Sequence, residues 1–182
     1  MEEVMDFTQY LELIHTQYGV LSKEFVISKL YHEVTVRDDF QLVIVGDIED
    51  ATDSTKQYII VPLKKTTKLT VIINNYKTDA FYGQIVENLS LSLSKIIRNY
   101  ITAKAISYGE MLFGNSKTNS GFVSKMNRDL GMPEGVGAIN NFRKMRASEF
   151  DLTSEQRVEL SQKMKNSPMV NLKYIRKILK TK

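Results

Sequence analysis

The sequence contains no cysteine, which excludes disulfide bonds, thiolate metal sites and cysteine nucleophiles together. It also lacks long apolar runs: the longest are about the length of a β-strand, well short of the ~18–20 residues that a membrane span needs. The N-terminal residues MEEVMDF are acidic and do not have the pattern of a secretory signal. We therefore expect a soluble, intracellular protein with no membrane partner.

Several common catalytic signatures are also missing. The two histidines, His15 and His32, lie in different segments without acidic residues at metal-ligand spacing, so we interpret both as surface or packing residues. No glycine-rich phosphate loop of the Walker or dinucleotide type is present, and no nucleophile elbow is visible. The chemistry of this chain has to be sought in other residue types.

The bulk composition is that of an ordinary globular domain. The 182 residues are 42% hydrophobic and 25% charged, which suits one domain with a real core. The net charge of +4 is unevenly distributed, because residues 1–53 are rich in acids whereas residues 173–182 are rich in Lys and Arg and contain no acid. Such a basic tail attracts polyanions. It is equally compatible with a solvated helix end, where cations favour the macrodipole.

The hydrophobic periodicity predicts helices, then a small sheet, then helices again. Helical spacing runs from Phe7 to Tyr18 and again from about Ser22. Short β-branched runs begin at Gln41, Gln57 and Lys68, with a weaker fourth after Gly83. Helical patterns return after Leu89, at about 120–130, 138–150 and 153–165, and from Pro168 to the end, with Thr153 and Gln156 forming a predicted capping box. This order predicts one α+β domain over residues 1–182.

The last third of the chain contains two motifs that stand together. The segment INNFRKMRASEF includes Asn140 and Arg143, and the segment KNSPMVNLKYIRK includes Asn166 and Tyr174. They resemble the two C-terminal motifs of tyrosine recombinases (integrases), in which a His-x-x-Arg helix precedes a Gly-His-Ser turn and a helix that presents the nucleophilic tyrosine. The separation of 31 residues between Arg143 and Tyr174 is similar to that of the family.

The resemblance extends towards the N-terminus. The segment VTVRDDFQLVIV resembles the first arginine motif of the family, which assigns that arginine to Arg37. The segment IINNYKTDAFYGQ resembles the hairpin that carries the catalytic lysine, which assigns it to Lys77. The similarity covers about residue 22 to the end and is greatest to recombinase-like proteins of large DNA viruses and mobile elements. It implies a mostly helical catalytic-type domain with a small antiparallel sheet of three to four strands.

The family resemblance also implies a mechanism. Arg37 and Arg143 would clamp the scissile phosphate, because a planar guanidinium matches two phosphate oxygens and stabilises charge in the transition state. Tyr174 would attack the phosphorus and form a 3′-phosphotyrosyl link to double-stranded DNA, and Lys77 would protonate the departing 5′ oxygen. The implied reaction needs no metal, cofactor or small-molecule substrate. A homo-oligomer assembled on DNA is the implied partner state, and the implied location is at the DNA.

Two departures from the family pattern leave an alternative open. Asn140 and Asn166 occupy positions where the family has histidine, and an amide cannot exchange a proton near neutral pH, although it can donate a hydrogen bond to phosphate. The alternative function is therefore a weak or inactive DNA-binding or virion-associated protein derived from the same fold. Only 36 residues precede Arg37, so we expect no separate N-terminal core-binding domain in this chain.

Each assigned residue also has a purely structural interpretation. Arg37 lies beside Asp38 and Asp39, which favours a local ion pair. Lys77 suits a solvated turn, and Arg143 shares its helix with other basic residues, which favours a basic surface face. Tyr174 follows Val170 by one helical turn and suits a core aromatic. A protein-interaction domain with a basic tail is thus a further interpretation, although the shared order and spacing favour the DNA enzyme.

Overall fold

The computed structural model describes residues 6–34, 39–74, 83–132 and 138–147, together with residues 153, 155, 156, 158 and 159. These residues form five α-helices, one short 3-10 helix and one four-stranded sheet. The chain is therefore an α+β protein, as the sequence predicts. The elements are α1 Phe7–Tyr18, α2 Lys23–Glu33, β1 Leu42–Val45, η1 Ile48–Asp50, β2 Gln57–Ile60, β3 Thr70–Ile73, β4 Ile85–Asn88, α4 Leu91–Ala103, α5 Ser120–Asp129 and α6 Ala138–Ala147.

The first two helices begin and end where their sequences carry capping residues. Asp6 and Gln9 form a capping box at the start of α1, and Ser22 accepts a hydrogen bond from the backbone N–H of Phe25 at the start of α2. Gly19 ends α1 with a φ of 85°, a conformation that side chains with a Cβ disfavour. The helix predictions for both segments are confirmed.

The sheet has the strand order β1-β2-β3-β4, and it is mixed rather than antiparallel. Strands β2, β3 and β4 form the expected antiparallel meander, but β1 pairs with β2 in parallel, with Ile44 opposite Ile59. The prediction of an antiparallel sheet is therefore wrong for this pair. The physical reason is the connection through η1, which returns the chain to the end of the sheet where β1 began, as a parallel pair requires.

The outer edge of β1 is covered by a segment that follows α4. The N–H of Ile44 donates to the carbonyl of Glu110 at 2.9 Å, and the carbonyl of Ile44 accepts from the N–H of Gly109 at 2.8 Å. The N–H of Leu112 donates to the carbonyl of Leu42 at 2.9 Å. Val43 and Met111 form an antiparallel bridge. These bonds satisfy backbone groups that an edge strand would otherwise expose.

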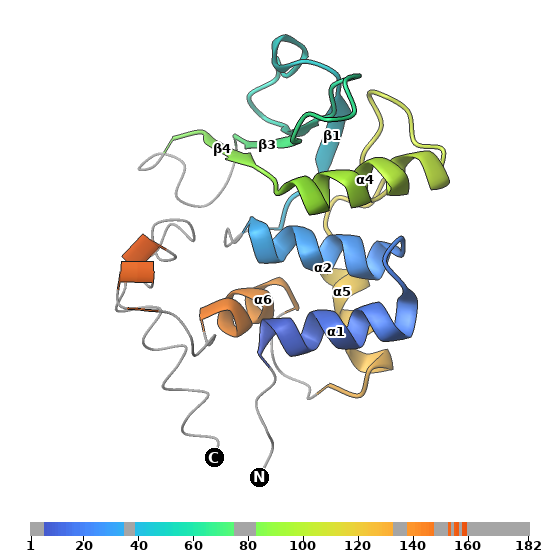
Figure 1. Ribbon diagram of the computed structural model, residues 1–182, viewed down its shortest axis with the longest axis vertical. Helices are drawn as coiled ribbons and strands as arrows, with labels where there is room; N and C mark the ends of the chain where they lie inside the picture. Colours follow the sequence, from blue (N-terminus) through green and yellow to red (C-terminus); the bar gives the residue numbers. More distant parts are fainter. Residues whose placement is uncertain are drawn as a thin grey trace.

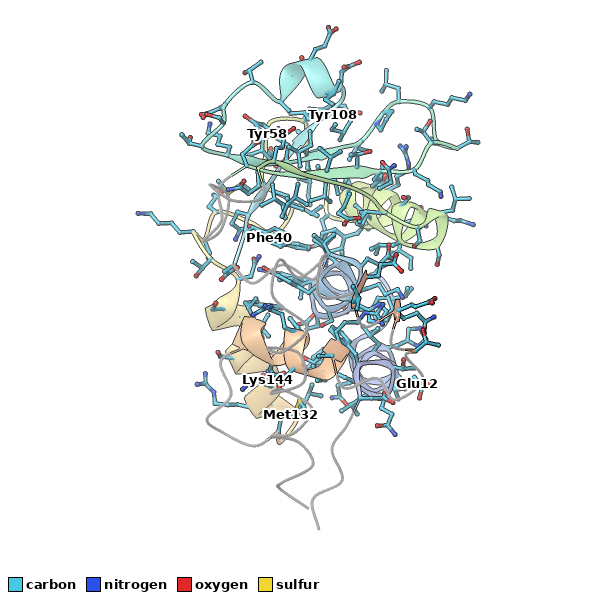
Figure 2. All side chains as sticks on the ribbon, turned by 90° about the vertical axis from the view of Figure 1, so that its left-hand side faces the viewer. Glu12, Phe40, Tyr58, Tyr108, Met132 and Lys144 are labelled. Atoms are coloured by element: carbon cyan, nitrogen blue, oxygen red, sulfur yellow. The ribbon has the colours of Figure 1, made fainter. Side chains whose placement is uncertain are left out.

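One face of the sheet packs against the helices and the other does not. Figure 1 shows the sheet at one end of the molecule, α4 and α2 beneath it, and α1, α5 and α6 at the other end. The large core contains Ile44, Ile59 and Val71 of the sheet together with buried residues of every helix. Figure 2 shows Phe40 between the sheet and the helices, whereas Tyr58 and Tyr108 lie on the side of the sheet away from them.

The helices after the sheet agree with the predicted pattern wherever the structure describes them. Ser90 caps α4, and its backbone N–H and hydroxyl both donate to the carboxylate of Glu33 at 2.7 Å. Thr153 and Gln156 form the predicted capping box, with reciprocal hydrogen bonds of 2.8 and 3.2 Å. The helix predicted from Pro168 lies outside the described residues. Among the described helices, none is long and apolar enough to cross a bilayer.

Candidate functional site

Helix α6 carries Arg143, the one assigned site residue whose side chain the structure describes. The helix packs against α1, α2 and α5, and Ile139, Phe142 and Met145 turn into the core with no more than 5% of their surfaces exposed. Arg143 is equally deep, with 2% of its surface exposed. The interpretation of Arg143 as part of a basic surface face is therefore wrong. Burying a guanidinium is costly without specific polar contacts, so this position is not that of an ordinary surface arginine.

An aromatic cluster fixes the position of α6. The ring of Phe142 stacks on Phe7 and on Tyr31, with centroids 5.4 Å apart in both pairs, and meets Tyr10 edge-on at 5.7 Å. These rings come from α1 and α2, so the two N-terminal helices form the surface on which α6 rests. Because Arg143 follows Phe142 directly, packing of the ring also fixes the position of the Arg143 backbone.

Asp39, two residues after Arg37, caps the N-terminus of α5. Its carboxylate accepts hydrogen bonds from the backbone N–H groups of Asn119 and Ser120 at 2.8 Å and from the hydroxyl of Ser120 at 2.7 Å. The hydroxyl of Tyr31 donates to the same carboxylate at 3.1 Å. A carboxylate at a helix N-terminus satisfies free N–H groups and favours the helix dipole. The Asp39 side chain is therefore engaged by α5 and α2.

Asn119 completes the attachment of this segment. Its side chain is buried, with 1% of its surface exposed, and its amide donates to the carbonyl of Phe40 at 2.7 Å. The amide of Gln41 donates to the Asn119 Oδ1 at 3.0 Å. Residues 39–41 are thus held to the start of α5 by side-chain and backbone contacts on both sides. Sequence reasoning missed this network, because it treated Asp39 only as an ion-pair partner of Arg37.

Burial strongly affects the tyrosines of the helical core. Desolvation raises the pKa of Tyr31 far above its ordinary value, and the neighbouring Asp39 carboxylate raises it further. Desolvation also raises the pKa of Tyr10, whose hydroxyl donates to Asn127 at 2.8 Å. Burial therefore favours the protonated form of both phenols, which donate hydrogen bonds to Asn127 and Asp39.

The base of the β3–β4 hairpin is fixed by Asn74. Its side-chain amide donates to the carbonyl of Lys56 at 2.8 Å, its Oδ1 accepts from the amide of Gln84 at 2.7 Å, and its backbone N–H donates to the Gln57 Oε1 at 2.7 Å. Asn74 therefore joins the end of β3 to the start of β2 and to the residue before β4.

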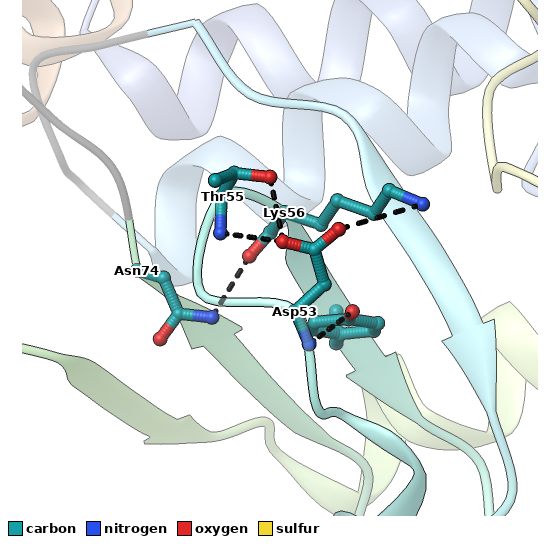
Figure 3. Close-up of polar contacts among 5 residues, drawn as sticks. Asp53, Thr55, Lys56 and Asn74 are labelled. Atoms are coloured by element: carbon teal, nitrogen blue, oxygen red, sulfur yellow. Dashed lines mark hydrogen bonds and ion pairs between the residues drawn. The ribbon is translucent and has the colours of Figure 1, made fainter.

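The neighbouring turn before β2 is itself built from short-range bonds. Figure 3 shows the Asp53 carboxylate between the Thr55 hydroxyl and backbone N–H, at 2.6 and 2.9 Å, and the Lys56 ammonium at 3.8 Å. These hydrogen bonds lower the pKa of Asp53 below its ordinary value. The carbonyl of Lys56 that receives the Asn74 amide thus belongs to an ordered turn.

The side chains of the other assigned residues are not among those that the structure describes. Arg37, Lys77, Asn166 and Tyr174 lie outside the described residues, and for Asn140 only the backbone, in the first turn of α6, is described. Asp39 is the first described residue after Arg37, and Asn74 is the last described residue before Lys77.

The histidines pack as the sequence analysis expected. His32 meets the ring of Phe7 edge-on at 4.9 Å, and His15 meets Phe25 at 5.5 Å. Within the part of the chain that the structure describes, no group of three or more metal-ligating side chains occurs. The ring contacts agree with the interpretation of the histidines as surface or packing residues.

Comparison of the chain with family models, with curated proteins and with solved structures found no match. The resemblance to tyrosine recombinases therefore depends on the four sequence motifs.

Proposed function

We propose that this chain is a tyrosine-recombinase-type catalytic domain that breaks and rejoins double-stranded DNA, as in integration or site-specific recombination. The observation that carries the proposal is the burial of Arg143 on α6, at the position of the second arginine of the family. A basic surface face leaves its guanidinium groups exposed, whereas a phosphate clamp uses guanidinium groups on elements that packing holds in place, as the rings of Phe7 and Tyr31 hold α6.

The contacts of Tyr31 add support from a second motif. Its ring stacks on Phe142, the neighbour of Arg143, and its hydroxyl donates to Asp39, two residues after Arg37. Tyr31 therefore contacts Phe142, the sequence neighbour of Arg143, and Asp39, which follows Arg37 by two residues. These contacts support the proposal of a two-arginine clamp.

In the proposed reaction, the Tyr174 hydroxyl oxygen attacks the phosphorus of one DNA strand. The Tyr174 proton passes to solvent, the bond between phosphorus and the 5′ oxygen breaks, and Lys77 donates a proton to that oxygen. The products are a 3′-phosphotyrosyl link and a free 5′ hydroxyl. Arg37 and Arg143 stabilise the added charge on the non-bridging oxygens. Rejoining reverses these steps, with a 5′ hydroxyl attacking the phosphotyrosine. A homo-oligomer on DNA follows from the same proposal, because exchange between two duplexes needs more than one cut.

The alternative function is DNA binding by the same fold without the chemistry. It is favoured by Asn140 and Asn166, which replace both motif histidines with amides. Loss of general-base assistance to Tyr174 costs about 10²- to 10⁴-fold in rate. The alternative therefore predicts salt-sensitive DNA binding with no covalent product.

Trapping on a suicide DNA substrate, a nicked duplex that loses its leaving strand after attack, tests the proposal. Wild type is expected to give a denaturation-resistant protein–DNA band that Tyr174→Phe lacks and that the matched control Tyr18→Phe retains. A band of equal strength in Tyr174→Phe excludes that nucleophile. Tight binding without any band, over a panel of duplex sequences, supports the non-catalytic alternative.

A further inference from the structure

The turn between β2 and β3 presents a cluster of positive charge on the surface. We define the lysine turn as residues 62–68; its lysines, Lys64, Lys65 and Lys68, are all exposed. The stretch 57–74 contains no acidic residue, and neither does α4. The ion pairs described in the structure, Lys56–Asp53 and Lys125–Asp129, involve none of these three lysines.

Arg98 of α4 holds the lysine turn in one shape. Its guanidinium donates to the carbonyl of Pro62 at 2.7 Å and to the carbonyls of Lys64 and Thr67 at 3.1 Å each. The Lys64 carbonyl also accepts from the Thr67 N–H at 3.2 Å. Both terminal nitrogens of Arg98 therefore donate to the backbone of the turn, whereas the lysine side chains are exposed.

Both ends of the turn are fixed as well. The hydroxyl of Tyr108 donates to the carbonyl of Val61 at 2.7 Å, and the buried hydroxyl of Ser94 accepts from the N–H of Leu69 at 2.9 Å. Lys95 on α4 is exposed and lies three residues before Arg98, which places it on the same helix face. The backbone that carries the three lysines is thus held in place, and a backbone fixed before binding lowers the entropic cost of contact with a ligand.

From this arrangement we infer that the lysine turn, with Lys95, is a binding surface for the phosphate backbone of double-stranded DNA. Lysine ammonium groups are point charges suited to phosphates, and the exposed hydroxyls of Thr66 and Thr67 add hydrogen-bond donors of the kind that contact phosphate oxygens. The surface does not depend on Tyr174 and would bind DNA in a sequence-independent manner.

An anionic membrane is the competing polyanion, because Leu63 is 86% exposed beside the lysines. Polybasic membrane sites usually combine about 4–8 cations with an amphipathic or lipidated anchor, whereas the lysine turn offers one apolar side chain. The threonine hydroxyls and the single exposed apolar side chain of the turn favour DNA. Asp47 and Asp50, which line a hollow together with Pro62 and Leu63, limit the positive surface on that side.

The test measures binding of a short labelled duplex as a function of salt. The combined variant Lys64→Gln, Lys65→Gln, Lys68→Gln is expected to lower the slope of log affinity against log salt by about 2–3, since each phosphate contact contributes about 0.9. A charge-matched control replaces Lys29, Lys117 and Lys125 with glutamine and is expected to lower this slope much less. Equal losses in the two triple variants, or an unchanged slope in the first, overturn the inference.

Two further variants separate shape from charge. Arg98→Lys keeps the net charge but replaces two separate terminal nitrogens with a single ammonium nitrogen, which cannot reproduce the planar fork that reaches the three carbonyls. A several-fold weaker affinity is therefore expected in a protein that still folds. Asp50→Asn removes a nearby negative charge and is expected to strengthen binding. Binding to phosphatidylserine vesicles that exceeds DNA binding and disappears in Leu63→Ala would assign the surface to a membrane and overturn the inference.

The outcome is independent of the proposed recombinase activity. Lysine-dependent DNA binding by a protein that never forms an adduct supports the surface and contradicts the enzyme. Adduct formation with a salt slope unchanged in the lysine variant supports the enzyme and contradicts the surface.

Discussion

Tyr31 stacks on Phe142 with ring centroids 5.4 Å apart and an angle of 23° between the ring planes. The same tyrosine donates its hydroxyl to Asp39. One side chain of α2 therefore touches both the helix that carries Arg143 and the segment that follows Arg37. The predictions below concern the stability of this junction and the proposed chemistry around it.

Replacing Asp39 with alanine is expected to destabilise the fold. Two N–H groups at the start of α5 and the hydroxyls of Ser120 and Tyr31 would lose their acceptor, and loss of a charged cap with these bonds costs about 2–3 kcal/mol. Urea unfolding measures the difference in free energy of unfolding. The control Glu12→Ala, on the exposed face of α1, should change it by no more than about 0.5 kcal/mol. Equal effects of the two variants would contradict the capping role.

Stability should decline at alkaline pH because of the buried tyrosines. Burial raises the pKa of Tyr31 and Tyr10 in the folded state, so the folded protein holds these protons more tightly than the unfolded chain. Their contribution is fully present below the unfolded pKa of about 10 and is lost as pH rises from there through the folded values. Urea unfolding above about pH 9 should show this decline. Tyr31→Phe should reduce the steepness of this decline; equal steepness in wild type and Tyr31→Phe would contradict the assignment.

Arg143→Lys tests the proposed phosphate clamp. Lysine keeps the charge but cannot contact two phosphate oxygens in one plane, so the rate of adduct formation on the suicide substrate should fall by roughly 10²- to 10³-fold. DNA affinity should change much less than the rate. The neighbouring variant Lys144→Gln is the control and should retain adduct formation. A wild-type rate in a folded Arg143→Lys protein would remove Arg143 from the mechanism.

Asn74→Ala tests whether the base of the β3–β4 hairpin positions Lys77. Loss of the bonds to Lys56 and Gln84 should slow adduct formation about tenfold by impairing proton delivery to the leaving oxygen. A substrate with sulfur in place of that oxygen needs no such proton and should restore the rate. Asn88→Ala, at the other end of the same strand pair, is the control. A defect that the sulfur substrate does not restore would show that Asn74 acts through overall structure.

Local features were readable from the sequence because their causes are local. The predicted cap at Thr153 satisfies an N–H group only three residues away, and a short apolar run with β-branched residues is enough to predict a strand such as Leu42–Val45. The direction of β1 was not readable, since strand pairing depends on the path of the η1 connection. Parallel and antiparallel arrangements of so short a strand have the same apolar pattern.

The candidate site also has features that the sequence determines and features that only the tertiary structure decides. The order of Arg37, Lys77, Arg143 and Tyr174, and the two asparagines at histidine positions, are properties of the sequence alone. Whether Arg143 faces solvent or core was decided by tertiary structure, because its helix carries basic residues on more than one side and only the packing of Phe142 on Phe7 and Tyr31 selects the buried face. The role of Asp39 at the start of α5 likewise joins residues 80 apart in the chain, a contact that no local pattern encodes.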